Sequence, residues 1–76
     1  MLELVEYMVR ALVDNPEQVS VREIKGQSIL VYEVDVAEED LGKVIGKNGR
    51  IANALRTIVK ASAMKQQKKA TVEILS

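Results

Sequence analysis

The apolar positions near the start of the chain recur at helical spacing. Side chains at intervals of three and four residues would form one stripe: Val5, Met8, Val9, Leu12 and Val13. Glu3 and Glu6 would lie in the first turn, where the helix dipole favours carboxylates. Pro16 follows, and a proline disfavours the helical conformation at the residue before it. The pattern therefore predicts an amphipathic helix that ends before Pro16.

Two segments of alternating polarity come next. Residues 19–25 alternate, and Gly26 with Gln27 would supply a hairpin turn. Residues 29–36 give the strongest strand pattern, with an apolar face of Leu30, Tyr32, Val34 and Val36. The opposite face carries Ile29 and Val31 together with Glu33 and Asp35. We expect an antiparallel hairpin with the first face toward the core.

The second half of the chain predicts two helices and a strand. Residues 38–40 are all acidic and would favour the start of a short helix over residues 41–45. A loop at residues 46–49 leads into a long helix that ends near Lys65, and residues 71–75 form a last strand. Helical periodicity predicts that the long helix faces the sheet with these residues: Ile51, Leu55, Ile58, Val59 and Ser62.

The order of elements is helix, strand, strand, helix, helix, strand. The last strand would run parallel to the second, because a two-helix crossover joins them, and that connection should be right-handed. This predicts an α+β fold with a three-stranded mixed sheet and three helices on one face. Its 76 residues suit a single domain over residues 1–76.

Composition makes catalysis the weakest of the function classes. Cysteine and histidine are both absent, which removes disulfides, the usual zinc ligands and histidine-based catalysis. Asp35 and the acids at 38–40 could be taken for a metal site, but their spacing favours a charged helix start. We predict a protein that is not an enzyme and needs no metal or cofactor. Acids near the first residue and no membrane-length apolar run predict a soluble cytoplasmic protein without a membrane partner.

The formal net charge of zero hides a strong asymmetry. Residues 1–41 hold three basic and ten acidic side chains, whereas residues 42–69 hold eight basic and no acidic ones. A stretch of 28 residues without a carboxylate favours one surface that meets a polyanion over a chance clustering of charge.

The segment with the clearest chemistry is the loop of Gly46, Lys47, Asn48 and Gly49 between two helices. Its glycines permit left-handed backbone and close approach, and unpaired N–H groups at the next helix start attract anions. The spacing fits neither the nucleotide P-loop nor the dinucleotide fingerprint. A plain turn between helices is the alternative, but the surrounding basic stretch favours nucleic acid.

The loop and the order of elements resemble those of KH (K-homology) domains of the bacterial, type II form. Three further segments are similar to the small stand-alone bacterial KH proteins of the KhpA family: residues 4–7, 11–16 and 42–47. The resemblance covers essentially the whole chain. The general KH pattern has a larger aliphatic residue where this chain has Ala52, which would rotate the packing of the long helix.

The resemblance implies binding of single-stranded RNA, with the loop clamping the backbone and the bases in an adjacent groove. Gly46, Lys47, Asn48 and Gly49 would hold phosphates. The apolar floor of the groove would come from Val44, Ile45 and Ile51. The flanks of the backbone path would come from a second set: Lys43, Arg50, Asn53, Arg56 and Lys60. Phe and Trp are absent, so we expect modest affinity and low sequence specificity. A post-transcriptional regulator or RNA chaperone would fit.

A dimerisation or adaptor module with weak or secondary RNA binding is the main alternative. A stripe of small or flexible side chains runs along the long helix and would suit a homodimer: Ala54, Thr57, Ala61 and Met64. Intrinsic helix propensity would also explain these residues. Ile29 and Val31 offer a second candidate surface. The KhpA resemblance also implies a second KH protein, KhpB, as a possible partner.

Overall fold

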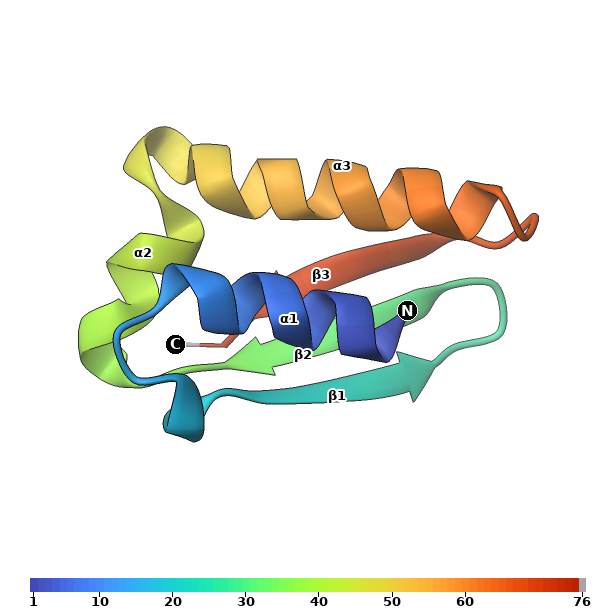
Figure 1. Ribbon diagram of the computed structural model, residues 1–76. Helices are drawn as coiled ribbons and strands as arrows, with labels where there is room; N and C mark the ends of the chain where they lie inside the picture. Colours follow the sequence, from blue (N-terminus) through green and yellow to red (C-terminus); the bar gives the residue numbers. More distant parts are fainter. Residues whose placement is uncertain (76) are drawn as a thin grey trace.

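The computed structural model describes residues 1–75 and contains the expected order of elements (Figure 1). The helices and strands are α1 (Leu2–Leu12), β1 (Ser20–Lys25), β2 (Leu30–Asp35), α2 (Leu41–Ile45), α3 (Arg50–Met64) and β3 (Ala70–Ile74). Short 3₁₀ turns are η1 (Pro16–Gln18), η2 (Glu38–Asp40) and η3 (Lys47–Gly49). Within the described residues, no helix is long and apolar enough to cross a membrane.

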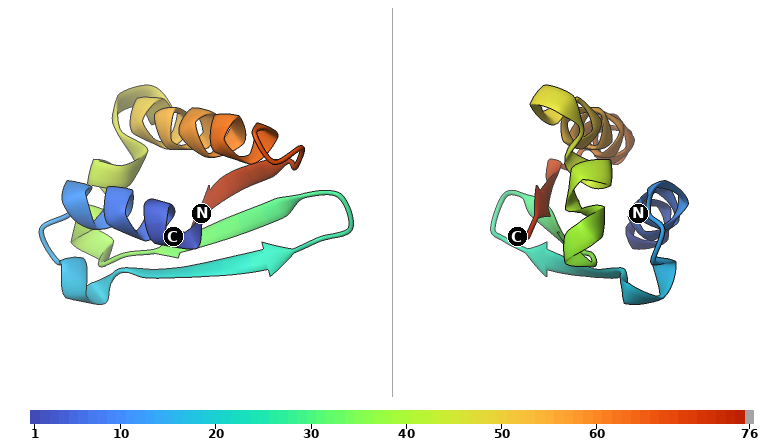
Figure 2. Two further views of the ribbon diagram at one scale, coloured as in Figure 1. Left: turned by 45° about the vertical axis from the view of Figure 1, so that its right-hand side comes forward. Right: turned by 90° about the vertical axis from the view of Figure 1, so that its left-hand side faces the viewer.

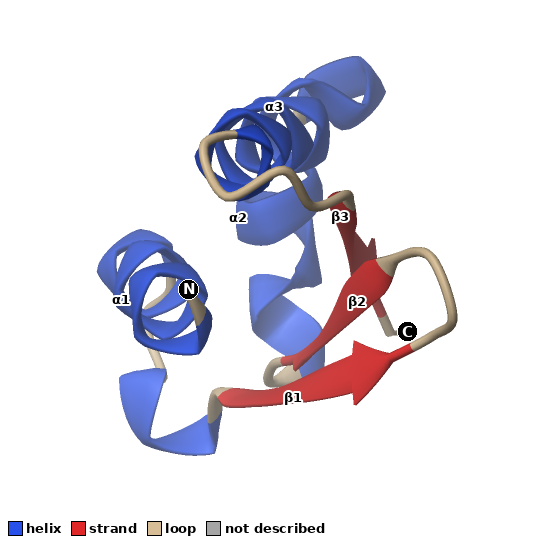
Figure 3. Cartoon of the chain, turned by 90° about the vertical axis from the view of Figure 1, so that its right-hand side faces the viewer, coloured by secondary structure: helices blue, strands red, loops and turns tan. Residues whose placement is uncertain are grey.

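The sheet is mixed and has the strand order β1-β2-β3. β1 pairs antiparallel with β2, with Val21 opposite Val34, and β3 pairs parallel with β2, with Ala70 opposite Leu30. The three α-helices lie on one side of this sheet, and its other side is open (Figure 3). These findings confirm the α+β fold class and the parallel crossover.

The core forms where the strand pattern predicts it. Tyr32, Val34 and Val36 are buried with Val5 and Val9 of α1 in one cluster. Strand alternation explains this, because every second side chain of β2 points toward the helices.

Tyr32 carries a polar atom into the core, and that atom has a hydrogen-bond partner. Its hydroxyl donates a hydrogen bond of 2.6 Å to the carboxylate of Glu23, which lies opposite it on β1. Burial and this hydrogen bond raise the pKa of Tyr32 to about 12. The ring is therefore fixed inside the molecule and presents no face to a ligand.

Helix α3 is rotated relative to the expected orientation. Its buried side chains are Ala52, Leu55, Val59 and Ala63. Ile58 is 46% exposed, so the prediction that it faces the sheet is wrong. The two alanines have short side chains that let α3 pack closely on the sheet, which turns Ile58 toward α1.

An apolar groove of about 300 Å³ separates α1 from α3. The residues that line it come from both helices: Tyr7, Met8, Ala11, Leu12, Ile51, Ala54, Leu55 and Ile58. Ile51 and Ile58 both line this groove, so both side chains lie beside α1 rather than facing the sheet.

The loops gather at two opposite ends of the molecule. The α2–α3 loop lies at one end, and the β1–β2 hairpin and the α3–β3 connection lie at the other (Figures 1 and 2). Helix α3 runs between the two ends alongside β3, and the whole domain is 35 Å in its longest dimension.

Candidate functional site

The loop between α2 and α3 adopts backbone conformations that favour glycine. Gly46 has φ 77° and ψ 170°, a region that is essentially restricted to glycine. Asn48 and Gly49 both have positive φ, at 57° and 74°. The Gly46 N–H donates to the Gly42 carbonyl at 2.9 Å, and the Gly49 N–H donates to the Gly46 carbonyl at 3.1 Å. The chain therefore reverses in one compact turn.

The two loop glycines have different roles. A Cβ at Gly46 would lie 2.6 Å from Ile51 Cγ1 and 2.9 Å from the Ile51 backbone nitrogen, so Gly46 is needed for packing within the domain. At Gly49 the nearest atom to such a Cβ is Asn53 Nδ2, at 3.9 Å. The surface at Gly49 therefore leaves room for another molecule to approach.

Several predicted ligand-binding side chains meet at this end of the molecule. Lys47, Asn48 and Arg50 are exposed around the start of α3, and Asn53 follows one turn later. The first turn of α3 contains no acidic residue. The first N–H groups of a helix lack partners within it, and they coincide with the positive end of the helix dipole. Lys60 is also exposed but lies further along α3.

Lys43 belongs to a different electrostatic environment from Lys47 and Arg50. Its Nζ lies 3.2 Å from a carboxylate oxygen of Asp14 and 3.7 Å from one of Asp40. The hydrogen bond and charge of Asp14, with a smaller effect of Asp40, raise the pKa of Lys43 despite its partial desolvation. Its positive charge is partly neutralised, and it holds α2 against the α1–β1 connection.

Arg56 connects α3 to the edge strand β3. Its Nε donates a hydrogen bond of 3.0 Å to the Val72 carbonyl, and its Nη1 donates one of 2.9 Å to Asn53 Oδ1. The sequence analysis placed Arg56 on a flank of the RNA backbone path, but the side chain is half-buried and held by these contacts. It fixes the distance between α3 and β3 beside the loop.

The predicted apolar floor is only partly exposed. Val44 has no exposed surface and belongs to the core cluster, so its placement on a ligand-facing floor is corrected. Ile45 is 38% exposed beside the loop, whereas half-buried Ile51 packs at Gly46 and lines the groove between α1 and α3. Val44 and Ile45 differ because they are consecutive residues of the short helix α2, which directs Val44 inward and Ile45 toward the surface.

The sequence analysis missed the open position at Gly42 and the structural role of Asp40. Gly42 lies within α2, and a Cβ there would meet nothing within 4 Å, so its surface is open. A glycine inside a helix destabilises it by about 1 kcal/mol relative to alanine. A glycine within a predicted helix was therefore a signal that this position has a special role. Asp40 is fully buried, yet its partners lie 25 or 26 residues earlier, which local sequence patterns do not reveal.

A mixed three-stranded sheet covered on one face by three helices, with a Gly-x-x-Gly loop between the last two, defines a KH domain of type II. The chain belongs to the KhpA/KhpB KH-domain family, whose model matches residues 2–74. Membership of this non-enzymatic family confirms that the protein is not an enzyme.

Three curated relatives show how closely the chain follows this family. It is 55% identical over 75 residues to RNA-binding protein KhpA of Clostridium perfringens, covering 99% of this chain and 100% of the relative. It is 56% identical over 73 residues to that of Caldanaerobacter subterraneus, covering 96% and 97%. The protein of that name in Treponema pallidum is 49% identical over 73 residues, covering 96% and 91%. No solved structure matches the chain significantly.

Proposed function

We propose that the chain, as a single KH domain over residues 1–76, binds single-stranded RNA through its Gly46–Gly49 loop. The observation that carries this proposal is the open surface at Gly49, which lies beside Lys47, Arg50 and the acid-free start of α3. A phosphate there would meet backbone N–H groups and full positive charges together. The names of the relatives, which describe RNA-binding proteins, support the same ligand.

The roles of the individual residues follow from their exposure. Lys47, Asn48 and Gly49 would contact phosphates, with Gly46 holding the loop in shape. Arg50, Asn53 and Lys60 would follow the backbone along α3, and Ile45 would supply apolar surface. Arg56 would act mainly by positioning β3, and Lys43 by positioning α2.

Low sequence specificity is part of this proposal. Tyr32 is buried and bonded to Glu23, and Tyr7 lies on the groove between α1 and α3. The buried Tyr32 ring is not available for base stacking, Tyr7 is on α1 rather than in the loop, and the chain has no Phe or Trp. A cytoplasmic RNA chaperone or post-transcriptional regulator suits such a binder, and a strand-annealing assay with unrelated RNA pairs would test the chaperone role.

The decisive experiment replaces Lys47 and Asn48 with Asp. This double variant sets two negative charges at the phosphate site, and both positions are exposed, so the fold should persist. Arg10→Asp with Gln18→Asp makes the same change in net charge at exposed positions of α1 and η1. In a filter-binding titration with single-stranded RNA, we expect the loop variant to lose binding and the control to retain it. Equal affinity in both folded variants would show that the loop is not the site.

A protein-interaction module is the second candidate function, and the exposed apolar surface of α1 and α3 favours it. Tyr7 and Met64 are 74% and 62% exposed, and Ile58 lines the groove together with Ala54 of the predicted stripe. A homodimer through α3 would present two loops to one RNA, which raises avidity. KhpB, which shares the family model, is the candidate for a heteromeric partner.

A further inference from the structure

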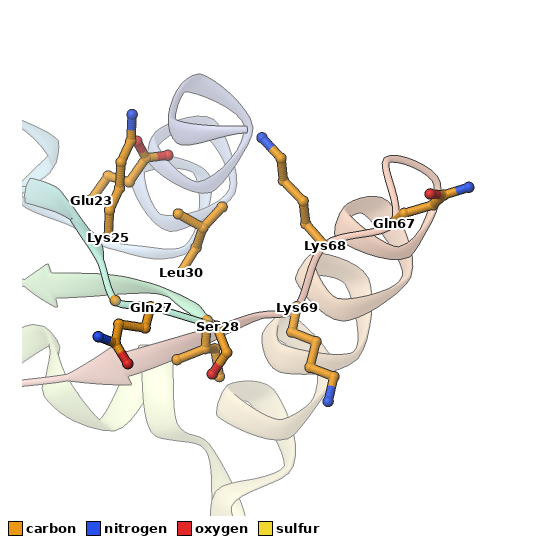
Figure 4. Close-up of a pocket in the computed structure, with 10 residues that line it drawn as sticks. Glu23, Lys25, Gln27, Ser28, Leu30, Gln67, Lys68 and Lys69 are labelled. Atoms are coloured by element: carbon orange, nitrogen blue, oxygen red, sulfur yellow. The ribbon is translucent and has the colours of Figure 1, made fainter.

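A notch of about 570 Å³ is lined by segments at the end of the molecule opposite the Gly46–Gly49 loop (Figure 1), and Figure 4 shows its lining residues. It opens between the β1–β2 hairpin and the α3–β3 connection. Residues of both segments line it: Glu23, Lys25, Gly26, Gln27, Ser28, Ile29, Leu30, Gln67, Lys68 and Lys69.

The lining of the notch is chemically suited to an anion. It holds three lysines and one acid, Glu23, whose carboxylate accepts the Tyr32 hydroxyl hydrogen bond. Within residues 1–75, no salt bridge involves Lys25, Lys68 or Lys69. Their charges are therefore uncompensated by direct contact, unlike that of Lys43.

Two of the lysines are directed to the same side. Lys25 and Lys68 rise on either side of Leu30 on the helix-covered side of the sheet, whereas Lys69 and Gln27 point to the opposite side (Figure 4). A phosphate above Leu30 would thus lie between two ammonium groups that approach it from different segments of the chain.

The backbone of both walls is fixed by hydrogen bonds. In the hairpin, the Gly26 N–H donates to the Ile29 carbonyl at 2.9 Å. The Leu30 N–H donates to the Lys69 carbonyl at 2.9 Å, and the Lys68 N–H donates to the Ala63 carbonyl at 3.0 Å. The lysine backbones are held in place before any ligand binds, which lowers the entropic cost of binding.

We infer that this notch is a second phosphate-binding site, which takes the backbone of the same RNA strand that the loop holds. The inference rests on the proposed function. Helix α3 has 15 residues and so spans about 22 Å, which is about seven nucleotides at the 3.4 Å spacing of a stacked strand. Lys60 and Lys65 are exposed between the two sites. A tetranucleotide would fill the loop site alone, whereas a dodecanucleotide would reach the notch.

The test compares these two RNAs on three proteins: the parent, Lys25→Gln with Lys68→Gln, and the control Arg10→Gln with Arg22→Gln. Both double variants remove two positive charges, and the control positions are exposed and do not line the notch. Two extra phosphate contacts should steepen the salt dependence of dodecanucleotide binding by about 1.4 log units per log unit of salt. The advantage of the long RNA should then fall about sevenfold in the parent between about 50 and about 200 mM salt.

The outcomes separate the two proposals. A longer RNA offers more binding registers in every variant. The quantity to compare between variants is therefore the salt dependence of the advantage that the dodecanucleotide has over the tetranucleotide. We expect the Lys25→Gln, Lys68→Gln protein to keep tetranucleotide affinity and lose the extra salt dependence, while the control and Lys25→Arg with Lys68→Arg retain it. An unchanged salt dependence in the glutamine variant would overturn the second site. A parent that binds neither RNA would instead overturn the proposed function.

Discussion

Asp40 accepts two hydrogen bonds from Asn15, one from the backbone N–H and one from the side-chain amide, each at 3.0 Å. The Asp14 N–H donates a third, at 3.2 Å, and the carboxylate is fully buried. Asp40 is the last residue of η2, immediately before α2. These contacts tie the α1–β1 connection to the start of the helix that leads into the Gly46–Gly49 loop.

Replacing Asp40 with alanine should strongly destabilise the domain. The variant leaves the N–H groups of Asp14 and Asn15 without their acceptor and removes a charge partner of Lys43. Loss of such a buried charged acceptor should raise the equilibrium constant for unfolding on the order of a hundredfold. Denaturant unfolding measures this, with the exposed neighbour Glu39→Ala as the control. Equal stability of the two variants would contradict the assigned role.

Stability should also fall in acid because of Asp40. Burial alone would raise its pKa, but hydrogen bonds from Asn15 and Asp14 and the charge of Lys43 hold the pKa below its ordinary value. A lowered folded-state pKa means that the unfolded chain binds the proton more readily. The contribution of Asp40 to stability is therefore present at a pH above its ordinary pKa of 3.8, and it is lost as the pH falls through the lowered pKa of the folded state. We expect the stability difference between parent and Asp40→Asn to shrink in this range, and a constant difference would contradict it.

The fold could be predicted from the sequence where periodicity is local. The alternation in β2 correctly identified Tyr32, Val34 and Val36 as core residues, because strand geometry alone decides it. Periodicity failed for Ile58, since the buried face of α3 includes Ala52 and Ala63, whose small side chains contribute little to a hydrophobic pattern. The larger side chain of Ile58 lies outside this buried face because it borders the groove between α1 and α3.

The candidate site, like the fold, could be predicted only where the signal is local in the sequence. The conformation of Gly46 and Gly49 follows from their spacing, which is a local property. The restraint of Lys43 by Asp14, and of Arg56 by Val72, depends on contacts across the fold and was not visible in the sequence. Charge asymmetry marked the basic region but did not distinguish free cations from those already paired.

RNA affinity should decrease with salt. If two to four phosphates are neutralised, log K should fall against log salt with a slope of about −1.5 to −3, because each phosphate on a single strand contributes about 0.7. Equilibrium titration at several salt concentrations gives this slope. A slope near zero would mean that the basic surface does not meet the RNA backbone.

The glycines of the loop region should respond in opposite directions. Gly46→Ala would place Cβ 2.6 Å from Ile51 Cγ1 at positive φ, so we expect a loss of about 2 kcal/mol or more in unfolding free energy. Gly42→Ala meets nothing within 4 Å inside a helix and should stabilise by about 0.5–1 kcal/mol. Thermal unfolding measures both. A stable Gly46→Ala protein would show that the loop tolerates another conformation.

Self-association through α3 should depend on the predicted stripe. Ala54, Thr57, Ala61 and Met64 are all exposed on α3. Small side chains let two helices approach closely, and a two-fold dimer pairs one such patch with itself. Ala61→Glu would place like charges at the centre of this pairing, so we expect a folded monomer by sedimentation where the parent is a dimer. Gln66→Glu adds the same charge just beyond α3 and should remain dimeric. A parent that stays monomeric at high micromolar concentration would leave helix propensity as the explanation for the alanines.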